Sequence, residues 1–244
     1  MLFLYLQKMF TKAQYLKIGS LVLFLFFGGA PYVFSQIDAK KVDSLYRDDQ
    51  FYVGFNYNLL NNAPASTSQY GLSGGLQFGF IRDMPFSKDR KWSLGIGIGY
   101  ELDYLNHNIQ IQKDSNGSTS YNILLLNNFD KNRWVTHTIS LPVELRYRNS
   151  SPQKRKFFRF YPGFRFSRTI SSKALFNFNG TQLSYSSDLG FAQWQYGPTL
   201  SIGYAQFNFN VYYGLNTLFT SEAINVGAPS DISRIKIGII AYIL

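Results

Sequence analysis

Cysteine is absent from this 244-residue chain, and charged residues and histidines are scarce. Without cysteine the protein has no disulfide staples, no cysteine-ligated zinc site and no thiol catalysis. Charged residues make up 16% of the chain, below the roughly 25% of an average soluble domain. Aromatic residues are plentiful instead, with 23 Phe and 18 Tyr. This balance favours a chain with much apolar surface over an ordinary soluble enzyme.

The formal net charge of +10 raises the question of a nucleic-acid partner. The basic residues fall in three places: the N-terminus, two turn segments and the polar faces of predicted strands. They do not form one stripe interleaved with aromatic stacking platforms, which nucleic-acid binding requires. We therefore expect no nucleic-acid partner.

Residues 1–35 have the pattern of a bacterial signal peptide. Lys8, Lys12 and Lys17 form a basic region without acids, and an apolar run then leads to small residues before Gln36. We expect cleavage after Ser35, which leaves residues 36–50 as a periplasmic N-terminal arm. Two alternatives stay open. Translation starts at Met9 in one, and the segment is a membrane anchor in the other, although its apolar run is short for a span of about 20 residues.

From residue 51 to the end of the chain, the dominant pattern is alternation of apolar and small or polar residues, which is typical of β-strands. It predicts eight strands, at Phe51–Leu59, Tyr70–Phe80, Trp92–Tyr104, Val135–Tyr147, Phe158–Thr169, Trp194–Tyr204, Phe207–Asn216 and Arg234–Ile243. An even number of alternating strands behind a signal peptide is typical of an outer-membrane barrel. We predict an all-β fold, an eight-stranded antiparallel transmembrane β-barrel at residues 51–244.

The lengths of the connections support an orientation in the outer membrane. The segments at Arg82–Lys91, Asn149–Lys156 and Ala205–Gln206 are short, whereas the alternate connections, such as Lys113–Asn132, are mostly longer. Outer-membrane barrels have short turns on the periplasmic side and longer loops outside. The sequence therefore predicts that both mature termini lie in the periplasm.

A soluble eight-stranded barrel shares the same period and is the main alternative fold. Its polar face would meet water, but the polar face here is rich in Gly, Ser, Asn and Thr, which suits a narrow lumen better. Tyr and Trp also lie near strand ends, as an interfacial girdle requires. These residues are Trp92, Tyr104, Trp134, Tyr147, Trp194 and Tyr204. We favour the membrane barrel.

Charges of both signs are expected to face the lumen on adjacent strands. The predicted lumen charge network contains Glu101, Asp103, Glu144, Arg146, Arg159 and Arg165, with Arg148 on the same face. Eight strands enclose a space that side chains fill, and unpaired buried charge is costly. We expect a plugged interior; a selective ion path along these groups is the alternative. Pro142 interrupts one of these strands, and a bulge or bend is expected there because proline lacks an N–H.

Two basic turns are candidates for docking an acidic periplasmic partner. Their cations are Lys88, Arg90 and Lys91 in one turn and Lys154, Arg155 and Lys156 in the other. The alternative is that these charges simply anchor the turns in water.

Catalysis is not expected. His107 and His137 are the chain's two histidines, and neither has a second ligand at metal spacing. His137 is predicted to face lipid, whereas Ser140, three residues on, points to the opposite face. We expect no metal, no cofactor and no enzymatic activity.

Four segments carry a resemblance to a known family: "SLYRDDQFYVGFNYNLLNN", "SGGLQFGFIRDMP", "LPVELRYRNSSPQKRKFFRFYPGFRFS" and "NVYYGLNTLF". They resemble the PorT family of Bacteroidetes outer-membrane barrels over roughly residues 42–244, and the "GFIRDMP" turn is among the more distinctive parts. The resemblance implies an accessory component of the type IX secretion system, which supports gliding motility in some members, with no cofactor and no catalytic residues.

That reading implies partners among outer-membrane lipid or lipopolysaccharide and other secretion-system proteins of the outer membrane or periplasm. A barrel of eight strands is too small to conduct folded protein, so partner binding is the expected mode of action. The alternatives are a structural or adhesion barrel without a secretion role, or a channel for small hydrophobic solutes.

Overall fold

The computed structural model describes residues 49–114, 116–149, 157–186 and 188–243. The expected signal peptide at 1–35 lies outside the described residues, as does the expected arm at 36–50 except for Asp49 and Gln50. Gln50 already belongs to the first strand, one residue before the expected start of the barrel.

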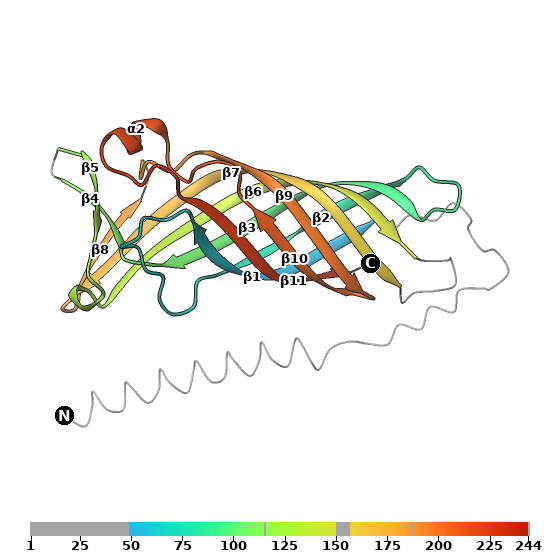
Figure 1. Ribbon diagram of the computed structural model, residues 1–244, viewed down its shortest axis with the longest axis horizontal. Helices are drawn as coiled ribbons and strands as arrows, with labels where there is room; N and C mark the ends of the chain where they lie inside the picture. Colours follow the sequence, from blue (N-terminus) through green and yellow to red (C-terminus); the bar gives the residue numbers. More distant parts are fainter. Residues whose placement is uncertain (1–48, 115, 150–156, 187, 244) are drawn as a thin grey trace, which may run out of the picture. The chain divides into compact units, whose positions relative to one another are not determined.

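Eight antiparallel strands form a closed barrel whose strands run obliquely to its long axis (Figure 1). They are β1 (Gln50–Asn61), β2 (Gly74–Pro85), β3 (Trp92–Asn106), β6 (Lys131–Arg148), β7 (Phe158–Phe178), β9 (Trp194–Tyr204), β10 (Phe207–Tyr213) and β11 (Ser233–Ile243). Their order is β6-β3-β2-β1-β11-β10-β9-β7, and the pairing of β7 with β6 closes the barrel. The eight-stranded barrel predicted from the alternation is confirmed.

The wall separates two faces, as the period of two requires. β1 alternates buried and exposed residues through its first eight positions. The exposed positions carry large apolar side chains; Phe55, Phe78 and Ile239 are 62%, 53% and 59% exposed. A contiguous apolar surface around the whole wall far exceeds what a soluble monomer exposes, and a lipid bilayer is the solvent that suits it.

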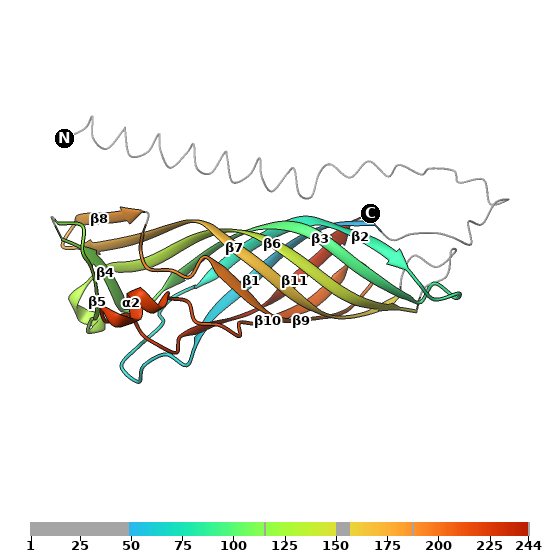
Figure 2. The same ribbon diagram turned by 90° about the horizontal axis from the view of Figure 1, so that it is seen from above.

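The connections fall into two groups at opposite ends of the barrel. The strand ends joined by the short connections β2–β3, β6–β7 and β9–β10 lie at one end, here called the turn end, where Phe51 of β1 also pairs with Ile243 of β11. The other end, here called the loop end, carries the longer connections and their small elements (Figures 1 and 2). These are the hairpin β4 (Ile109–Lys113) and β5 (Thr119–Ile123), the 3-10 turn η1 (Leu126–Asn128), β8 (Thr181–Ser186) and α2 (Ser221–Asn225).

The loop end is more structured than the alternation indicates, because the pattern predicts no element there. β7 is 21 residues long, and its final six residues pair with β8. Asn179 and Gly180 connect these two strands with φ values of 48° and 76°. Positive φ at both central residues is the geometry of a two-residue type I′ hairpin turn, which an Asn-Gly pair favours.

Pro142 does not produce a bulge, so the expectation of a bulge at this position is wrong. The β3–β6 ladder keeps one register from Ile96↔Val143 to Gly99↔Ser140 and lacks two pairs opposite Leu141 and Pro142. The missing proline N–H removes ladder bonds, but the flanking pairs hold the register. A register shift between β6 and β7 lies instead between His137 and Thr138 of β6, where Ile170 is the extra residue of β7. It lies just beyond the last β7–β9 pair and ahead of the pairing with β8.

Candidate functional site in the lumen and at the two ends of the barrel

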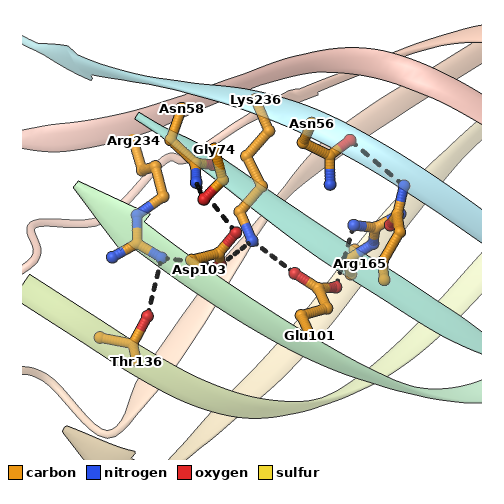
Figure 3. A network of polar contacts seen from close by, with 10 residues as sticks. Asn56, Asn58, Gly74, Glu101, Asp103, Thr136, Arg165, Arg234 and Lys236 are labelled. Carbon is orange, nitrogen blue, oxygen red and sulfur yellow. Dashed lines mark hydrogen bonds and ion pairs between the residues drawn. The ribbon is translucent and has the colours of Figure 1, made fainter. Parts of the chain in front are cut away.

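The loop-side cluster comprises five charged residues in the half of the lumen nearer the loops: Glu101, Asp103, Arg165, Arg234 and Lys236 (Figure 3). Lys236 lies between the two carboxylates, with its Nζ 2.6 Å from Asp103 Oδ2 and also bonded to Glu101. Arg165 Nη1 lies 3.0 Å from Glu101, and Arg234 Nη1 lies 3.1 Å from Asp103. The side chains come from β3, β7 and β11, so the cluster crosses the barrel.

The turn-side cluster comprises Asp83, Glu144, Arg146 and Arg148. Arg146 Nε lies 2.9 Å from Glu144 Oε2, and Arg148 Nη1 lies 2.8 Å from Asp83 Oδ2. The Arg146 guanidinium also lies over the rings of Tyr161 and Tyr242, 4.8 Å and 5.6 Å from their centroids. All four charged side chains are buried, and each has an opposite charge beside it, as burial of charge demands.

The structure brings five of the six residues of the predicted lumen network into these two clusters. The sixth, Arg159, is buried nearer the turn end, with its guanidinium 4.3 Å from the centroid of Phe157. The prediction omitted Asp83, Arg234 and Lys236. Arg234 and Lys236 lie on the polar face of the predicted C-terminal strand, so the strand pattern was a sufficient signal for them. Asp83 was assigned to the Arg82–Lys91 turn, and it joins the cluster because β2 continues to Pro85.

The space beside the loop-side cluster is small. A cavity of about 20 Å³ lies beside the loop-side cluster, lined by Glu101, Arg234 and Lys236 among others. A space of that size holds roughly one water molecule. Ion pairs therefore cross the lumen at a level where the cavity beside them is small.

The glycines of β3 make room for large side chains inside the narrow barrel. The Oη atom of Tyr52, from β1, lies 1.9 Å from where a Cβ on Gly99 would stand. The Nε atom of Arg146 lies 2.6 Å from the corresponding point on Gly95. Real Cβ atoms essentially never approach other atoms this closely, so the bulky ring and the guanidinium occupy the space that these glycines leave free.

A hydrophobic core, here called the cap, covers the loop end. Its buried members are Ile109, Ile111, Trp134, Ala174, Leu189, Leu218, Phe219, Ala223, Ala228 and Ile232. They come from the ends of β6 and β7, from β4 and from the later connections. Trp134 was expected in the interfacial girdle, but its side chain is fully buried in the cap. It lies at an inward position of β6, so strand parity, and not nearness to the strand end, determines its environment.

His107 lies beneath the cap, with its ring 3.7 Å from that of Trp134 between centroids. Its Nδ1 accepts a hydrogen bond of 3.1 Å from the Ile109 N–H. The side chain is fully buried, and burial lowers the His107 pKa from 6.5 to about 3. The neutral imidazole is therefore the form that the folded cap accepts.

Acid is expected to loosen the cap through His107. Because the pKa in the folded state lies below its ordinary value, the stabilisation is complete above about 6.5 and is lost as the pH falls from there toward about 3. Cleavage of the 107–130 connection by an acid-active protease should rise across this window. His107→Asn should flatten the dependence, and His137→Gln, a change at the other histidine, should preserve it. An unaltered cleavage rate from neutral pH to about 3 contradicts this account.

His137 faces outward on β6, where its Nδ1 meets the hydroxyl of Tyr100. Ser140 is fully buried on the inward face, so the two side chains do not form a catalytic pair. No group of three or more metal-ligating side chains occurs among the described residues. Within the same residues, no helix is long and apolar enough to cross a bilayer.

Hydrogen bonds to the backbone of the basic turn β2–β3 hold this turn against the barrel. Arg148 donates from its Nε to the Arg90 carbonyl and from its N–H to the Lys91 carbonyl, at 3.1 Å and 2.9 Å. Lys91 makes an exposed ion pair with Asp89 at 3.5 Å, and Lys88 is exposed. The cations of the second predicted turn, Lys154, Arg155 and Lys156, lie outside the described residues.

The closed barrel, its apolar wall and its charged lumen define the class of protein as a β-barrel of the outer-membrane type. Residues 34–220 match the family model described as an outer membrane protein beta-barrel domain. The chain therefore belongs to this family and is an outer-membrane protein.

Solved structures with a similar chain trace are distant. Ail, the attachment invasion locus protein of Yersinia pestis, is 12% identical with a TM-score of 0.34, covering 80% of this chain and 96% of Ail. The complex of Ail with the heparin analogue sucrose octasulfate is 11% identical with a TM-score of 0.33, covering 81% of this chain and 99% of Ail. A triple mutant of the Rhodopseudomonas blastica porin is 8% identical with a TM-score of 0.21, covering 81% of this chain and 100% of the porin. No curated protein matches. At these values, none of the three structures transfers a ligand or an activity to this chain.

Proposed function

We propose that this protein is a non-enzymatic accessory component of the type IX secretion system that acts by binding partners and not as the conduit. The observation that carries the second half of this proposal is the filled lumen, where Lys236 bridges Glu101 and Asp103 across the barrel. The secretion role is supported by the resemblance of "GFIRDMP" in β2 and "LPVELRYR" in β6 to the PorT family.

The turn end is proposed to face the periplasm. Short turns are typical of the periplasmic side of outer-membrane barrels, and the two ends of the barrel sequence, at Gln50 and Ile243, lie at this end. Residues 36–48 would then extend into the periplasm as the expected arm, after removal of the expected signal peptide.

The cations of the two basic turns defined in the sequence analysis are the proposed docking site for an acidic periplasmic partner. Arg148 fixes the backbone of Arg90 and Lys91, so this turn presents its cations from a defined position. A preorganised turn binds at a lower entropic cost than a flexible one. Charge complementarity would also accelerate the encounter with an acidic surface.

Deletion of the gene tests the secretion role. Export of type IX cargo is expected to fall to background in the deletion strain and to return when the wild-type gene is restored. Normal export in the deletion strain contradicts the proposal and favours a structural or adhesion barrel. Complementation with K88Q/R90Q/K91Q tests the docking turn, and it is expected to restore export poorly. K113Q, at the loop end, serves as the matched control and should restore export fully.

The purified barrel is expected to show no stable channel conductance in a planar bilayer. The buried ion pairs and the small cavity beside them support this expectation, because a wide water-filled path would require breaking those ion pairs. Conductance steps that are reproducible across preparations would contradict the filled lumen and favour the solute-channel alternative. Heat-modifiable migration on a gel shows that the sample is folded.

A further inference from the structure

The outer wall has a marked charge asymmetry. Outward-facing residues of the eight described barrel strands include five with a formal charge, and all five are cations: Arg82, Lys131, Arg133, Arg168 and Lys173. Every acidic residue within these strands faces the lumen and is buried. Four of the five outward cations lie on the neighbouring strands β6 and β7 in the half nearer the loops. These four residues, Lys131, Arg133, Arg168 and Lys173, are here called the wall patch.

The register brings the wall patch together. Lys173 pairs directly with Val135, and Arg133 stands two residues from Val135 on the same face. Arg133 and Lys173 are therefore diagonal neighbours, a relation that places Cα atoms about 7–8 Å apart. Lys131 is the next outward residue along β6, and Arg168 pairs with Ile139 farther down the wall. The cations thus line one vertical strip of two adjacent strands.

The wall patch lies at the level of the aromatic girdle. Tyr104 pairs with Val135, and the Arg133 guanidinium lies 4.9 Å from the centroid of the Tyr104 ring. Arg168 pairs with Trp194 and lies 5.6 Å from the centroid of its ring. Tyr and Trp mark the level of the lipid headgroups on a membrane barrel. Cations at this level, facing lipid, would meet headgroup phosphates without entering the hydrocarbon.

Like charges so close together need a counter-charge. The structure places Lys131, Arg168 and Lys173 at exposed positions, and Asp130 in the adjoining connection is the acid next to them in sequence. Arg133 is held in place by a bond of 2.7 Å from its Nε to Asn106 Oδ1. An oriented guanidinium beside two ammonium groups is well suited to phosphate, which accepts several charge-assisted hydrogen bonds.

We propose that the wall patch binds the phosphate groups of a phosphorylated glycolipid of the lipid A class in the outer leaflet. The site lies on the outside of the barrel and is independent of the proposed role in secretion. The apolar wall within and below the patch, which includes Val135, Ile139 and Phe166, would contact the acyl chains of the same molecule. A failure of this proposal leaves the secretion proposal intact, because the two use different surfaces.

Native mass spectrometry of the purified protein in zwitterionic detergent tests the proposal with three probes. Lipid A is expected to bind more tightly than the same lipid stripped of its phosphates. K131Q/K173Q, which changes two exposed side chains, should weaken lipid A binding by about tenfold and leave binding of the stripped lipid unchanged. K131R/K173R should restore it. R82Q, at the outward cation near the other end of the wall, is the matched control and should bind as the wild type does.

Three results would overturn the proposal, two with the lipids and one with inorganic phosphate. One is equal binding of lipid A and the stripped lipid to the wild type, and the other is full binding by K131Q/K173Q. Inorganic phosphate is the third probe, and it is expected to bind far more weakly than lipid A; equally tight binding would assign the site to free phosphate. R133Q provides a second variant of the patch, and heat-modifiable migration confirms that each variant is folded before its binding is compared.

Discussion

Replacing Asp103 with asparagine is expected to lower the free energy of unfolding by about 3 to 5 kcal/mol, the usual cost of removing one partner of a buried ion pair. Asp103 is fully buried, and its carboxylate accepts hydrogen bonds from the side chains of Lys236, Arg234 and Asn58. The substitution would leave three cations of the loop-side cluster facing the single carboxylate of Glu101. Asparagine has nearly the same shape, so the loss would come from charge and not from a cavity.

Urea unfolding in detergent or lipid bilayers, followed by heat-modifiable migration, measures this effect. D103N/K236M removes one charge of each sign and restores the net charge of the cluster, so it should be more stable than D103N. D130N, a carboxylate change at an exposed loop position, should unfold like the wild type. If D103N and D130N were equally stable, the loop-side cluster would have no role in holding the barrel together.

Replacing Gly99 with alanine is expected to destabilise the barrel by about 1 to 3 kcal/mol, the typical cost of overpacking. The new methyl group would stand 1.9 Å from the Oη atom of Tyr52. Tyr52 is 2% exposed and packs inside the barrel with Tyr242, at 6.4 Å between ring centroids, so its ring has little room to move away. The backbone of β3 or the ring of Tyr52 must shift to accept the change.

A double-mutant cycle with Tyr52→Phe isolates the clash. Removing the hydroxyl leaves the ring carbon Cζ at 3.0 Å from the new methyl position, a contact that a small movement relieves. The cost of G99A should therefore be smaller in the Y52F background, with a coupling free energy within the range of about 0.5 to 3 kcal/mol seen for residues in contact. Additive effects of the two substitutions would show that the tyrosine and the glycine do not share this space.

Sealing of the barrel combines two physical devices. The lumen contains charges of opposite sign that pair with one another, and the loop end is covered by an apolar core. Because the lumen charges pair with one another, they do not need water as a partner. The apolar core holds the loop-end connections in a defined structure. The proposed partner and lipid sites therefore lie at the turn end and on the outer wall.

Much of this architecture follows from the sequence by itself. A period of two assigns each side chain to one face of a strand, so the inward positions of Glu101, Glu144 and Arg146 and the outward position of His137 were predictable from parity. The number of strands in the barrel, and the division into short and long connections, followed from the same pattern. Local alternation is sufficient for these features because each depends on neighbouring residues alone.

Tertiary structure decided which inward residues meet. Lys236 reaches Asp103 across 133 positions of sequence, and this contact depends on strand order, register and closure, none of which a single strand records. The same holds for Trp134, which a position near a strand end assigned to the girdle but which the cap buries. The register shift lies at Ile170 and not at Pro142, because a proline removes a hydrogen bond, whereas register is set by the strands on both sides. Periodicity thus determined the faces of the barrel, and non-local packing determined the partners within it.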